Sequence, residues 1–388
     1  MLHLPIYLDN NATTPMDPRV LEAMIPFFTK YFGNAASSSH SLGWEAEEAV
    51  EKAREQVAEL INAEPNEIVF TSSATESDNL ALKGIFEMYA AKGNHFITVK
   101  TEHKAVLDSC EHLAKLGAEI TFLPVKKDGL IDLTQLENSI KPSTILICVM
   151  YANNETGVLQ PTRDISAIAK KHGVLFFSDA TQAVGKIPVD VILDGVDLMA
   201  FSAHKMHGPK GVGALYVRRK NPRVRITAQI DGGGHERGIR SGTLNVPGIV
   251  GFGKACELCR IEMQNDSQKT QILRDKLENE LLKIKGAQVN GNRQQRLPNV
   301  SNMSFKNINA ADLMGNLSGK IALSSGSACT SATHQPSFVL KALGLGDERA
   351  LSSLRFGLGR FTTEEEIDYT ISELAKFLMP KSANEVNK

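Results

Sequence analysis

The sequence has few aromatic residues, almost no net charge and no long hydrophobic run. Phe, Trp and Tyr make up 6% of its 388 residues, and the formal net charge is −1. A chain without an excess of one charge has no field that would attract nucleic acid or acidic lipid. No apolar run approaches the ~20 residues that span a bilayer, and the first residues show no secretory or transit pattern. We therefore expect a cytoplasmic globular protein that binds neither nucleic acid nor membrane.

Cysteine is scarce as well. The chain has five cysteines, and an odd number scattered in this way argues against a disulfide framework and indicates a reducing compartment. Cys256 and Cys259 have the spacing of half a zinc or redox motif, but their spacing is also helical, and we interpret them as helix packing. Cys110 and Cys148 lie in apolar segments and are interpreted as small core residues. No metal site is expected.

Two nucleotide-binding motifs are missing. The sequence contains no Gly-x-x-x-x-Gly-Lys-Ser/Thr loop. The glycines at Gly208, Gly211 and Gly213 follow no strand–helix unit in the order that a dinucleotide-binding fold requires. Neither the phosphate-loop nor the dinucleotide-binding class therefore fits.

Short apolar runs alternate with helical segments from residue 67 onward. Strands are expected at 67–71, 95–99, 120–123, 144–150, 174–177 and 196–201, and an antiparallel return at 213–217. Strands that alternate with helices are typical of an α/β protein with a mostly parallel sheet, here of seven strands. The regular alternation of strands and helices does not continue into residues 285–388, and the pattern of that part predicts a smaller α+β domain.

Polar side chains recur where these strands end. The carboxyl ends of parallel strands meet at one edge of the sheet, so residues from distant parts of the chain converge there. The residues concerned are Thr75, His103, Asn154, Asp179, Gln182, Ser202, His204 and Lys205. The sequence therefore predicts a binding site at this edge.

Lys205 is the residue around which this site is organised. It follows a short buried strand, and a lysine at that place suits a Schiff base better than a solubilising charge. Asp179 follows the buried run 175–177, where its carboxylate needs a cation such as a protonated pyridine nitrogen. A helix start at Ser73–Glu76 suits a phosphate. His103 could stack on a ring and move protons.

Each of these residues also has a simpler explanation. Asp179 could cap the next helix, Ser73 with Glu76 could form a capping box, and His103 could be a satisfied core histidine. Together, however, a lysine, an aspartate, a phosphate cradle and a histidine at one edge predict pyridoxal phosphate.

Two further residues stand out in the C-terminal part. Cys329 lies in a run of Ser, Gly, Ala and Thr, which indicates an exposed loop and a reactive thiol. Arg355 lies on an expected strand and suits the carboxylate of an amino acid, although a surface ion pair is the alternative.

At these residues the chain resembles the NifS/IscS-like cysteine desulfurases, which are class V members of the fold-type-I pyridoxal-phosphate enzymes. The resemblance runs nearly end to end and covers eight motifs in the family's order. They are YLDNNATT (7–14), ATES (74–77), EH (102–103), ANNETG (152–157), DATQ (179–182), SAHK (202–205), RSGT (240–243) and SAC (327–329).

The resemblance implies a role for each candidate residue. Lys205 would bond the cofactor, Asp179 its ring nitrogen and Gln182 its phenolic oxygen, with His103 stacked on the ring and Asn154 beside it. The phosphate would be held by Ala74, Thr75, Ser202 and His204, and by Thr243 from the second subunit of a homodimer. Arg355, with Asn10 or Asn11 and Asn154, would bind the carboxylate of L-cysteine.

Cys329 would then attack the substrate sulfur. The products would be L-alanine and a persulfide on Cys329, whose sulfur passes to an iron–sulfur scaffold or a thiolation acceptor. Cys329 could also hold a nascent iron–sulfur cluster transiently. The resemblance further implies a large cofactor-binding domain at 16–257 and a small domain at 1–15 and 258–388 that carries the cysteine loop.

Two other functions are weighed against this one. A different class V reaction, such as a selenocysteine lyase or an aminotransferase, would use the same cofactor site, and Cys329→Ser would abolish only desulfuration. A non-catalytic sulfur carrier or assembly platform with a vestigial site is disfavoured by the intact Lys205, Asp179 and His103.

Overall fold

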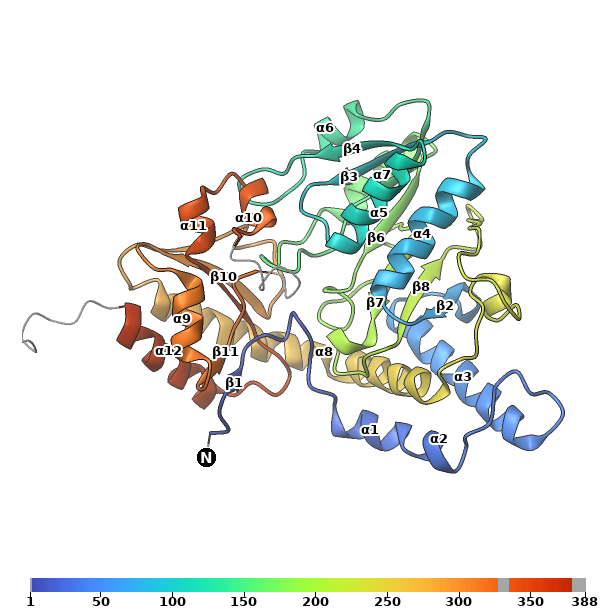
Figure 1. Ribbon diagram of the computed structural model, residues 1–388, viewed down its shortest axis with the longest axis horizontal. Coiled ribbons are helices and arrows are strands. Elements are labelled where there is room, and N and C mark those ends of the chain that lie inside the picture. The colour runs from blue at the N-terminus through green and yellow to red at the C-terminus, as the bar shows by residue number, and fades with distance from the viewer. Residues whose placement is uncertain (1, 327–334, 379–388) are drawn as a thin grey trace, which may run out of the picture.

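The computed structural model describes residues 2–326 and 335–378. Its largest element is a seven-stranded sheet with the order β2-β8-β7-β6-β5-β3-β4 (Figure 1). The strands are β2 (Ile68–Thr71), β3 (His95–Val99), β4 (Glu119–Leu123), β5 (Thr144–Cys148), β6 (Leu175–Asp179), β7 (Leu198–Ser202) and β8 (Gly213–Val217). Neighbouring strands from β4 to β7 pair in parallel, whereas β8 runs antiparallel to both β7 and β2. The predicted mostly parallel seven-stranded sheet is confirmed.

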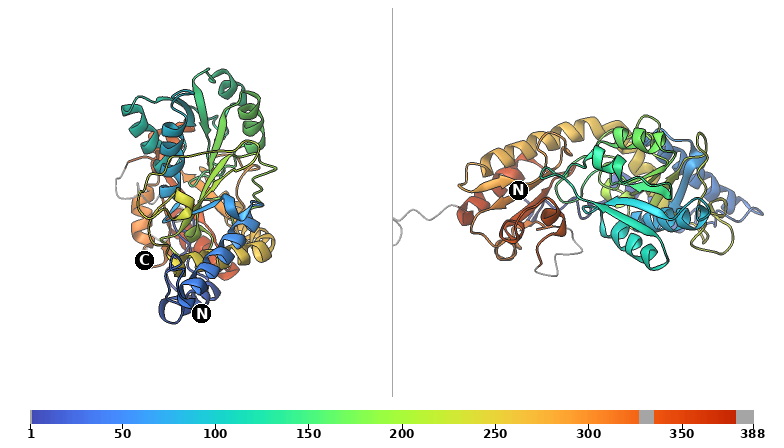
Figure 2. Two further views of the ribbon diagram at one scale, coloured as in Figure 1. Left: turned by 90° about the vertical axis from the view of Figure 1, so that its right-hand side faces the viewer. Right: turned by 90° about the horizontal axis from the view of Figure 1, so that it is seen from above.

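Helices cover both faces of this sheet (Figures 1 and 2). One face packs on α3 (Ser41–Leu60), α6 (Leu133–Asn138), α7 (Thr162–Lys171) and the start of α8 (Val246–Leu281), and the other on α4 (Ala74–Met88) and α5 (Lys104–Lys115). Successive strand residues point to opposite faces, so Ile68 and Phe70 enter the first core and Val69 the second. Burial on both faces explains why these strands are continuous apolar runs.

A second group of elements surrounds two smaller sheets. The order β12-β10-β9 forms a three-stranded antiparallel sheet, and β1 pairs in parallel with β11. The elements are β1 (Ile6–Tyr7), β9 (Ala287–Val289), β10 (Val300–Phe305), β11 (Ile321–Ala322), β12 (Ser353–Gly357), α9 (Ala310–Leu317), α10 (Phe338–Ala342), α11 (Asp347–Leu351) and α12 (Glu364–Leu378). They enclose a separate apolar core that includes Ile6, Leu354 and Phe356.

The long helix α8 connects the two groups (Figure 2). Its first half, through Cys259, packs in the core of the large sheet, and Leu273, Leu277 and Leu281 pack in the second core. The expected domain boundary at 257/258 falls inside this helix and stays a prediction. Short helices α1 (Pro18–Met24) and α2 (Pro26–Thr29) lie beside α8. Within the described ranges, no helix is both long enough and apolar enough to span a bilayer.

Candidate active site

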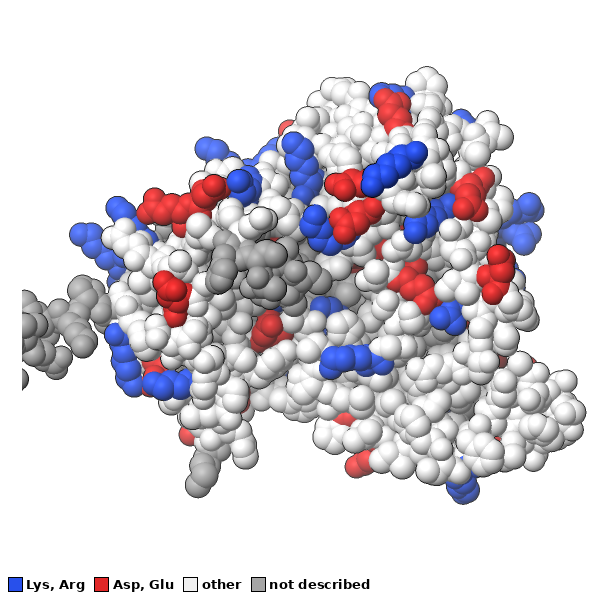
Figure 3. All heavy atoms as spheres, viewed as in Figure 1, with Lys and Arg blue, Asp and Glu red and all other residues white. Residues whose placement is uncertain are grey.

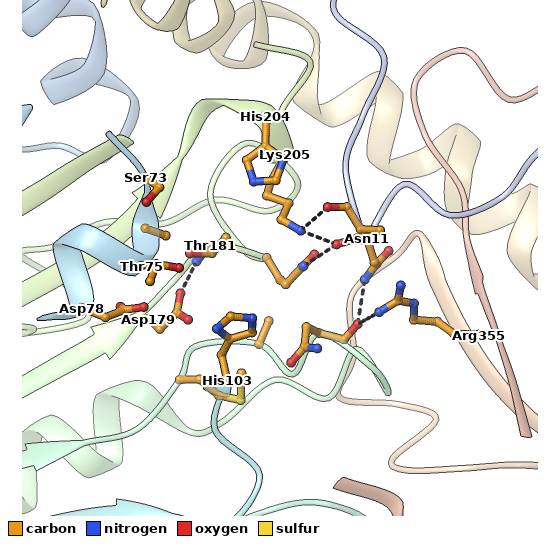
Figure 4. Close-up of a pocket in the computed structure, with 16 residues that line it drawn as sticks. Asn11, Ser73, Thr75, Asp78, His103, Asp179, Thr181, His204, Lys205 and Arg355 are labelled. Carbon is orange, nitrogen blue, oxygen red and sulfur yellow. Dashed lines mark hydrogen bonds between the residues drawn. The ribbon is translucent and has the colours of Figure 1, made fainter. Parts of the chain in front are cut away.

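The carboxyl ends of the parallel strands open into a cavity of about 210 Å³ (Figure 4). Ten of the residues expected at the site line it together. They are Asn11, Ala74, Thr75, His103, Asn154, Asp179, Gln182, His204, Lys205 and Arg355. Residues separated by more than 300 positions in the chain thus meet in one place, as the strand-end pattern predicts for most of them.

Lys205 projects into this cavity from a 3₁₀ turn, η2 (Ala203–Lys205), that directly follows β7. Its half-buried side chain donates hydrogen bonds from Nζ to the carbonyl oxygens of Asn11 and Ala12, at 2.6 and 2.7 Å. These carbonyls belong to the segment after β1, so the N-terminal segment orients the lysine. The amine therefore lies at the strand edge, where a carbonyl compound in the cavity can reach it.

Asp179 and His103 lie at the opposite wall of the cavity. Asp179 is the last residue of β6 and is 5% exposed, and its Oδ1 accepts a hydrogen bond from the Thr181 amide at 2.9 Å. His103 precedes α5, and its Nδ1 accepts a hydrogen bond from the Ala105 amide at 3.2 Å. Burial lowers the pKa of His103, and the neighbouring Asp179 charge partly opposes that shift. Both residues thus serve as local caps while they also face the cavity.

Asp78 is a cavity residue that the sequence reasoning missed. One of its oxygens, one oxygen of Asp179 and one ring nitrogen of His103 lie within 4.8 Å of one another. Asp78 is 1% exposed, and neither of its oxygens has a hydrogen-bond partner among the described residues. The signal was available: Asp78 is three positions after Thr75 at the start of α4, so both lie on one helix face.

Glu102 adds a third buried acid to this end. Its Oε1 accepts a hydrogen bond from the Met150 amide at 2.6 Å, and its side chain is fully buried. Burial raises the pKa of Asp78 and of Glu102 well above the usual range, and the charge of Asp179 raises each further. Both acids are therefore expected to hold their protons near neutral pH.

The start of α4 forms a third wall. Ser73 caps this helix by accepting a hydrogen bond from the Glu76 amide, and Ser73, Ala74, Thr75 and His204 line the cavity. The first amides of a helix, together with the positive end of its dipole, favour an anion. His204 lies beside Thr13 at 3.1 Å, and burial lowers its pKa to about 4, so its ring is neutral near pH 7.

Two expected phosphate ligands do not line this cavity. Ser202 is 1% exposed, and its hydroxyl donates to the Val212 carbonyl at 3.1 Å. Thr243 is exposed on the surface of the same chain. Within the described residues, the wall that suits an anion is therefore made by the start of α4 and His204.

Arg355 forms the end of the cavity opposite the buried acids. Its side chain is 1% exposed; Nη2 lies 2.6 Å from Asp9 Oδ1, and Nη1 donates to the Asn154 carbonyl at 3.0 Å. Its Nε and the Asn154 Oδ1 have no hydrogen-bond partner among the described residues, although both are buried. A guanidinium with unused donors suits a carboxylate.

Of the two asparagines considered beside Arg355, only Asn11 lines this cavity. Asn10 instead donates from Nδ2 to the Gly357 carbonyl at 2.9 Å and faces a smaller adjoining cavity.

Cys329 lies outside the described residues. The other four cysteines are buried, and burial raises the pKa of Cys110 to about 12 and of Cys259 to about 11. Cys256 and Cys259 pack in the core on α8, so their interpretation as helix packing is confirmed. None of these four is a reactive thiol in the folded state.

The Aminotransferase class-V family model matches residues 6–370. The chain belongs to this family. A curated relative named Cysteine desulfurase IscS, from Anaeromyxobacter sp. (strain K), is 57% identical over 371 residues, which cover 95% of this chain and 91% of that protein. A protein of the same name from Salmonella typhi is 54% identical over 377 residues, which cover 97% of this chain and 93% of that protein.

Solved structures of similar proteins have the same fold as this chain. A NifS-like protein superposes with a TM-score of 0.90 at 41% identity and covers 97% of this chain and 99% of its own. A structure described as SspA in complex with cysteine superposes with a TM-score of 0.81 at 36% identity and covers 92% of this chain and 100% of its own. The resemblance to the NifS/IscS-like cysteine desulfurases and the predicted fold are confirmed.

Proposed function

We propose that this protein is a pyridoxal-phosphate-dependent cysteine desulfurase that converts L-cysteine to L-alanine and carries the released sulfur as a persulfide on Cys329. The observation that carries this proposal is the meeting of Lys205, Asp179 and Arg355 at one cavity. The chain that forms this cavity is 57% identical, over 371 residues, to a protein named as a cysteine desulfurase.

The residues present fit the cofactor. Lys205 supplies an amine for its aldehyde, and Asp179 supplies a buried carboxylate for its ring nitrogen. Gln182 and the ring of His103 lie along the same cavity, and the start of α4 supplies amides for a phosphate. When bound, pyridoxal phosphate supplies an electron sink for the substrate's α-carbon.

The protein side chains would orient the substrate and move protons. Arg355, held by Asp9 and the Asn154 carbonyl, would orient the substrate carboxylate. The ring of His103 is neutral at neutral pH and can accept a proton, and the Lys205 amine can move protons at the α-carbon.

The sulfur step balances without an external oxidant. The C–S bond of L-cysteine breaks as the Cys329 thiolate attacks the sulfur, and an S–S bond forms. The β-carbon gains a proton, so L-cysteine and the Cys329 thiol become L-alanine and a Cys329 persulfide. An iron–sulfur scaffold or thiolation acceptor would then take the sulfur.

A homodimer forms part of the proposal. Several large apolar side chains of α1, α2, the loop after them and the start of α3 are exposed: Leu21, Ile25, Phe28, Phe32 and Trp44. Figure 3 shows few charged side chains over this lobe at the lower right. A second copy packed on such a patch would cover it, and the family resemblance implies that the partner subunit's Thr243 would then contact the phosphate. The cytoplasmic location stays a prediction.

One assay tests the function. The enzyme loaded with pyridoxal phosphate is incubated with L-cysteine and a thiol reductant, and alanine and sulfide are measured together. Equal amounts are expected, and Cys329→Ser should form neither. Pyruvate or another keto acid, or activity that survives Cys329→Ser, would instead indicate a different lyase, an aminotransferase or a selenocysteine lyase.

A further inference from the structure

We infer that Lys186 is a positioning residue of this site: it holds the Gln182 side-chain amide with its oxygen turned away from the cavity and its nitrogen toward it. The inference rests on the proposed function, because the group that the nitrogen would contact is the phenolic oxygen of pyridoxal phosphate.

Three hydrogen bonds carry the inference. Lys186 Nζ donates to Gln182 Oε1 at 2.8 Å, and Gln182 Nε2 donates to the Asn11 carbonyl at 2.9 Å. The same carbonyl accepts from Lys205 Nζ at 2.6 Å. Lys186 is therefore connected to the cavity lysine through one amide and one carbonyl oxygen.

This network permits only one orientation of the amide. In the opposite orientation, the amide nitrogen would face the Lys186 ammonium, and the amide oxygen would face the Asn11 carbonyl. The first contact would join two donors while Lys186 is protonated, and the second would join two acceptors whatever the protonation of Lys186. With its oxygen bonded to Lys186, Gln182 keeps one N–H for Asn11 and a second N–H for the cavity that it lines.

The backbone places Lys186 for this contact. Residues 180–187 form a helix-like turn in which Val184 N donates to Ala180 O and Ile187 N to Ala183 O. This spacing puts positions 182 and 186 on one face. The Ser267 hydroxyl, on α8, donates to the Lys186 carbonyl at 2.5 Å and fixes the end of the turn.

The surroundings of Lys186 offer no competing carboxylate. Its half-buried side chain lines a small adjoining cavity of about 40 Å³, together with Lys205, His207, Asp266 and Arg360. Asp266 is bonded to Arg360 at 2.7 Å, and Lys186 has no ion pair among the described residues. His207 is neutral near pH 7, because burial lowers its pKa to about 4.

Burial and the charges of Lys205 and Arg355 lower the pKa of Lys186 to about 7, against a smaller opposing effect of Cys259. Below about pH 7 the side chain is therefore mostly an ammonium, and in that form its hydrogen bond to the amide oxygen is charge-assisted.

The test uses Lys186→Met, with Lys52→Met on the exposed face of α3 as the matched control. Apoprotein is titrated with pyridoxal phosphate, and the visible absorption band of the loaded protein is followed against pH. Lys186→Met should bind the cofactor about tenfold more weakly, as expected when a charged hydrogen bond is lost. The pH midpoint of this band should rise by about one unit, because the Gln182 N–H that Lys186 holds toward the cavity favours the more anionic form of the bound group.

Two comparisons separate positioning from other roles. Lys186→Arg keeps the charge and the donors and should restore most of the midpoint. In a Gln182→Ala background, Lys186→Met should move the midpoint by less than about 0.3 unit, because interaction through Gln182 is then already lost. A full shift in that background would overturn the positioning role, and so would an unchanged midpoint and affinity in folded Lys186→Met.

Thermal unfolding of each apoprotein shows which variants fold. If Lys186→Met does not fold, Lys186→Gln replaces it in the test, because glutamine also lacks the ammonium. The pH midpoint of the band must then rise in Lys186→Gln. An unchanged midpoint would overturn the inference. Wild-type protein that binds no pyridoxal phosphate would refute the proposed function itself, which is a separate result from a folded variant that behaves like wild type.

Discussion

The two ends of the cavity accommodate buried charge in opposite ways. At one end, Asp78 and Glu102 are buried acids near Asp179, and burial together with the charge of Asp179 raises the pKa of both. At the other end, the Arg355 guanidinium is held by Asp9 and a carbonyl oxygen through Nη2 and Nη1. The comparison shows that an excess of like charge is relieved by holding protons, whereas a single buried charge needs a fixed partner.

Asp179→Asn should have the largest effect. The amide keeps the shape but removes the one charge that the acid end provides for the ring nitrogen, so we expect kcat to fall about 10³-fold, the loss typical of breaking a buried charge pair. The steady-state rate of alanine formation at saturating L-cysteine measures kcat. A kcat near wild type would mean that Asp78 or Glu102 carries the charge instead.

Arg355→Lys should have the next largest effect. Lysine keeps the charge but loses the planar fork, so the contacts to Asp9 and the Asn154 carbonyl cannot both be kept. We expect KM for L-cysteine to rise about 100-fold, with a smaller change in kcat. Steady-state kinetics gives both constants. A fall in kcat at constant KM would contradict the carboxylate-binding role.

Asp9→Asn should have a smaller effect, because it changes a partner of Arg355 and leaves Arg355 itself in place. The amide oxygen can still accept from Arg355 Nη2, but the charge that holds the guanidinium is lost. KM should rise about tenfold, and the temperature of unfolding should fall. An unchanged KM would show that the Asn154 carbonyl alone suffices to orient Arg355.

Asp78→Asn is the matched substitution at the acid end and should have the smallest effect. If Asp78 is neutral, an amide of the same shape replaces it with less than about a threefold change in kcat. A fall in kcat comparable to that of Asp179→Asn would show that Asp78 is ionised. The acid end of the cavity would then not differ from the Arg355 end in the way proposed here.

The stability difference between Asp78→Asn and wild type should depend on pH. The pKa of Asp78 is raised by folding, so above its unfolded value of about 3.9 the unfolded chain releases a proton that the folded chain keeps. Wild-type stability therefore falls as pH rises, and Asp78→Asn removes that loss. The variant should gain about 1–3 kcal/mol relative to wild type between pH 5 and pH 7, measured by denaturant unfolding of the apoprotein.

Much of the site was predictable because parallel strands place their carboxyl ends together. Lys205, Asp179, His103 and Asn154 each lie at or just after the end of a strand, and the alternation of strands with helices therefore indicated one edge for all of them. Arg355 was assigned from its residue type and the family resemblance. Its partner Asp9 is 346 positions away, a contact that no local pattern indicates.

The sequence alone determined the α/β class, the edge of the sheet at which the site lies, and the lysine at its centre. This was possible because an apolar run indicates a buried strand, and the polar residues after it indicate where that strand ends. Only the tertiary structure decided which acids keep their protons, which way the Gln182 amide faces, and that Ser202 points away from the cavity. Protonation and amide orientation depend on distances between side chains and on the exclusion of water, and neighbours along the chain determine neither.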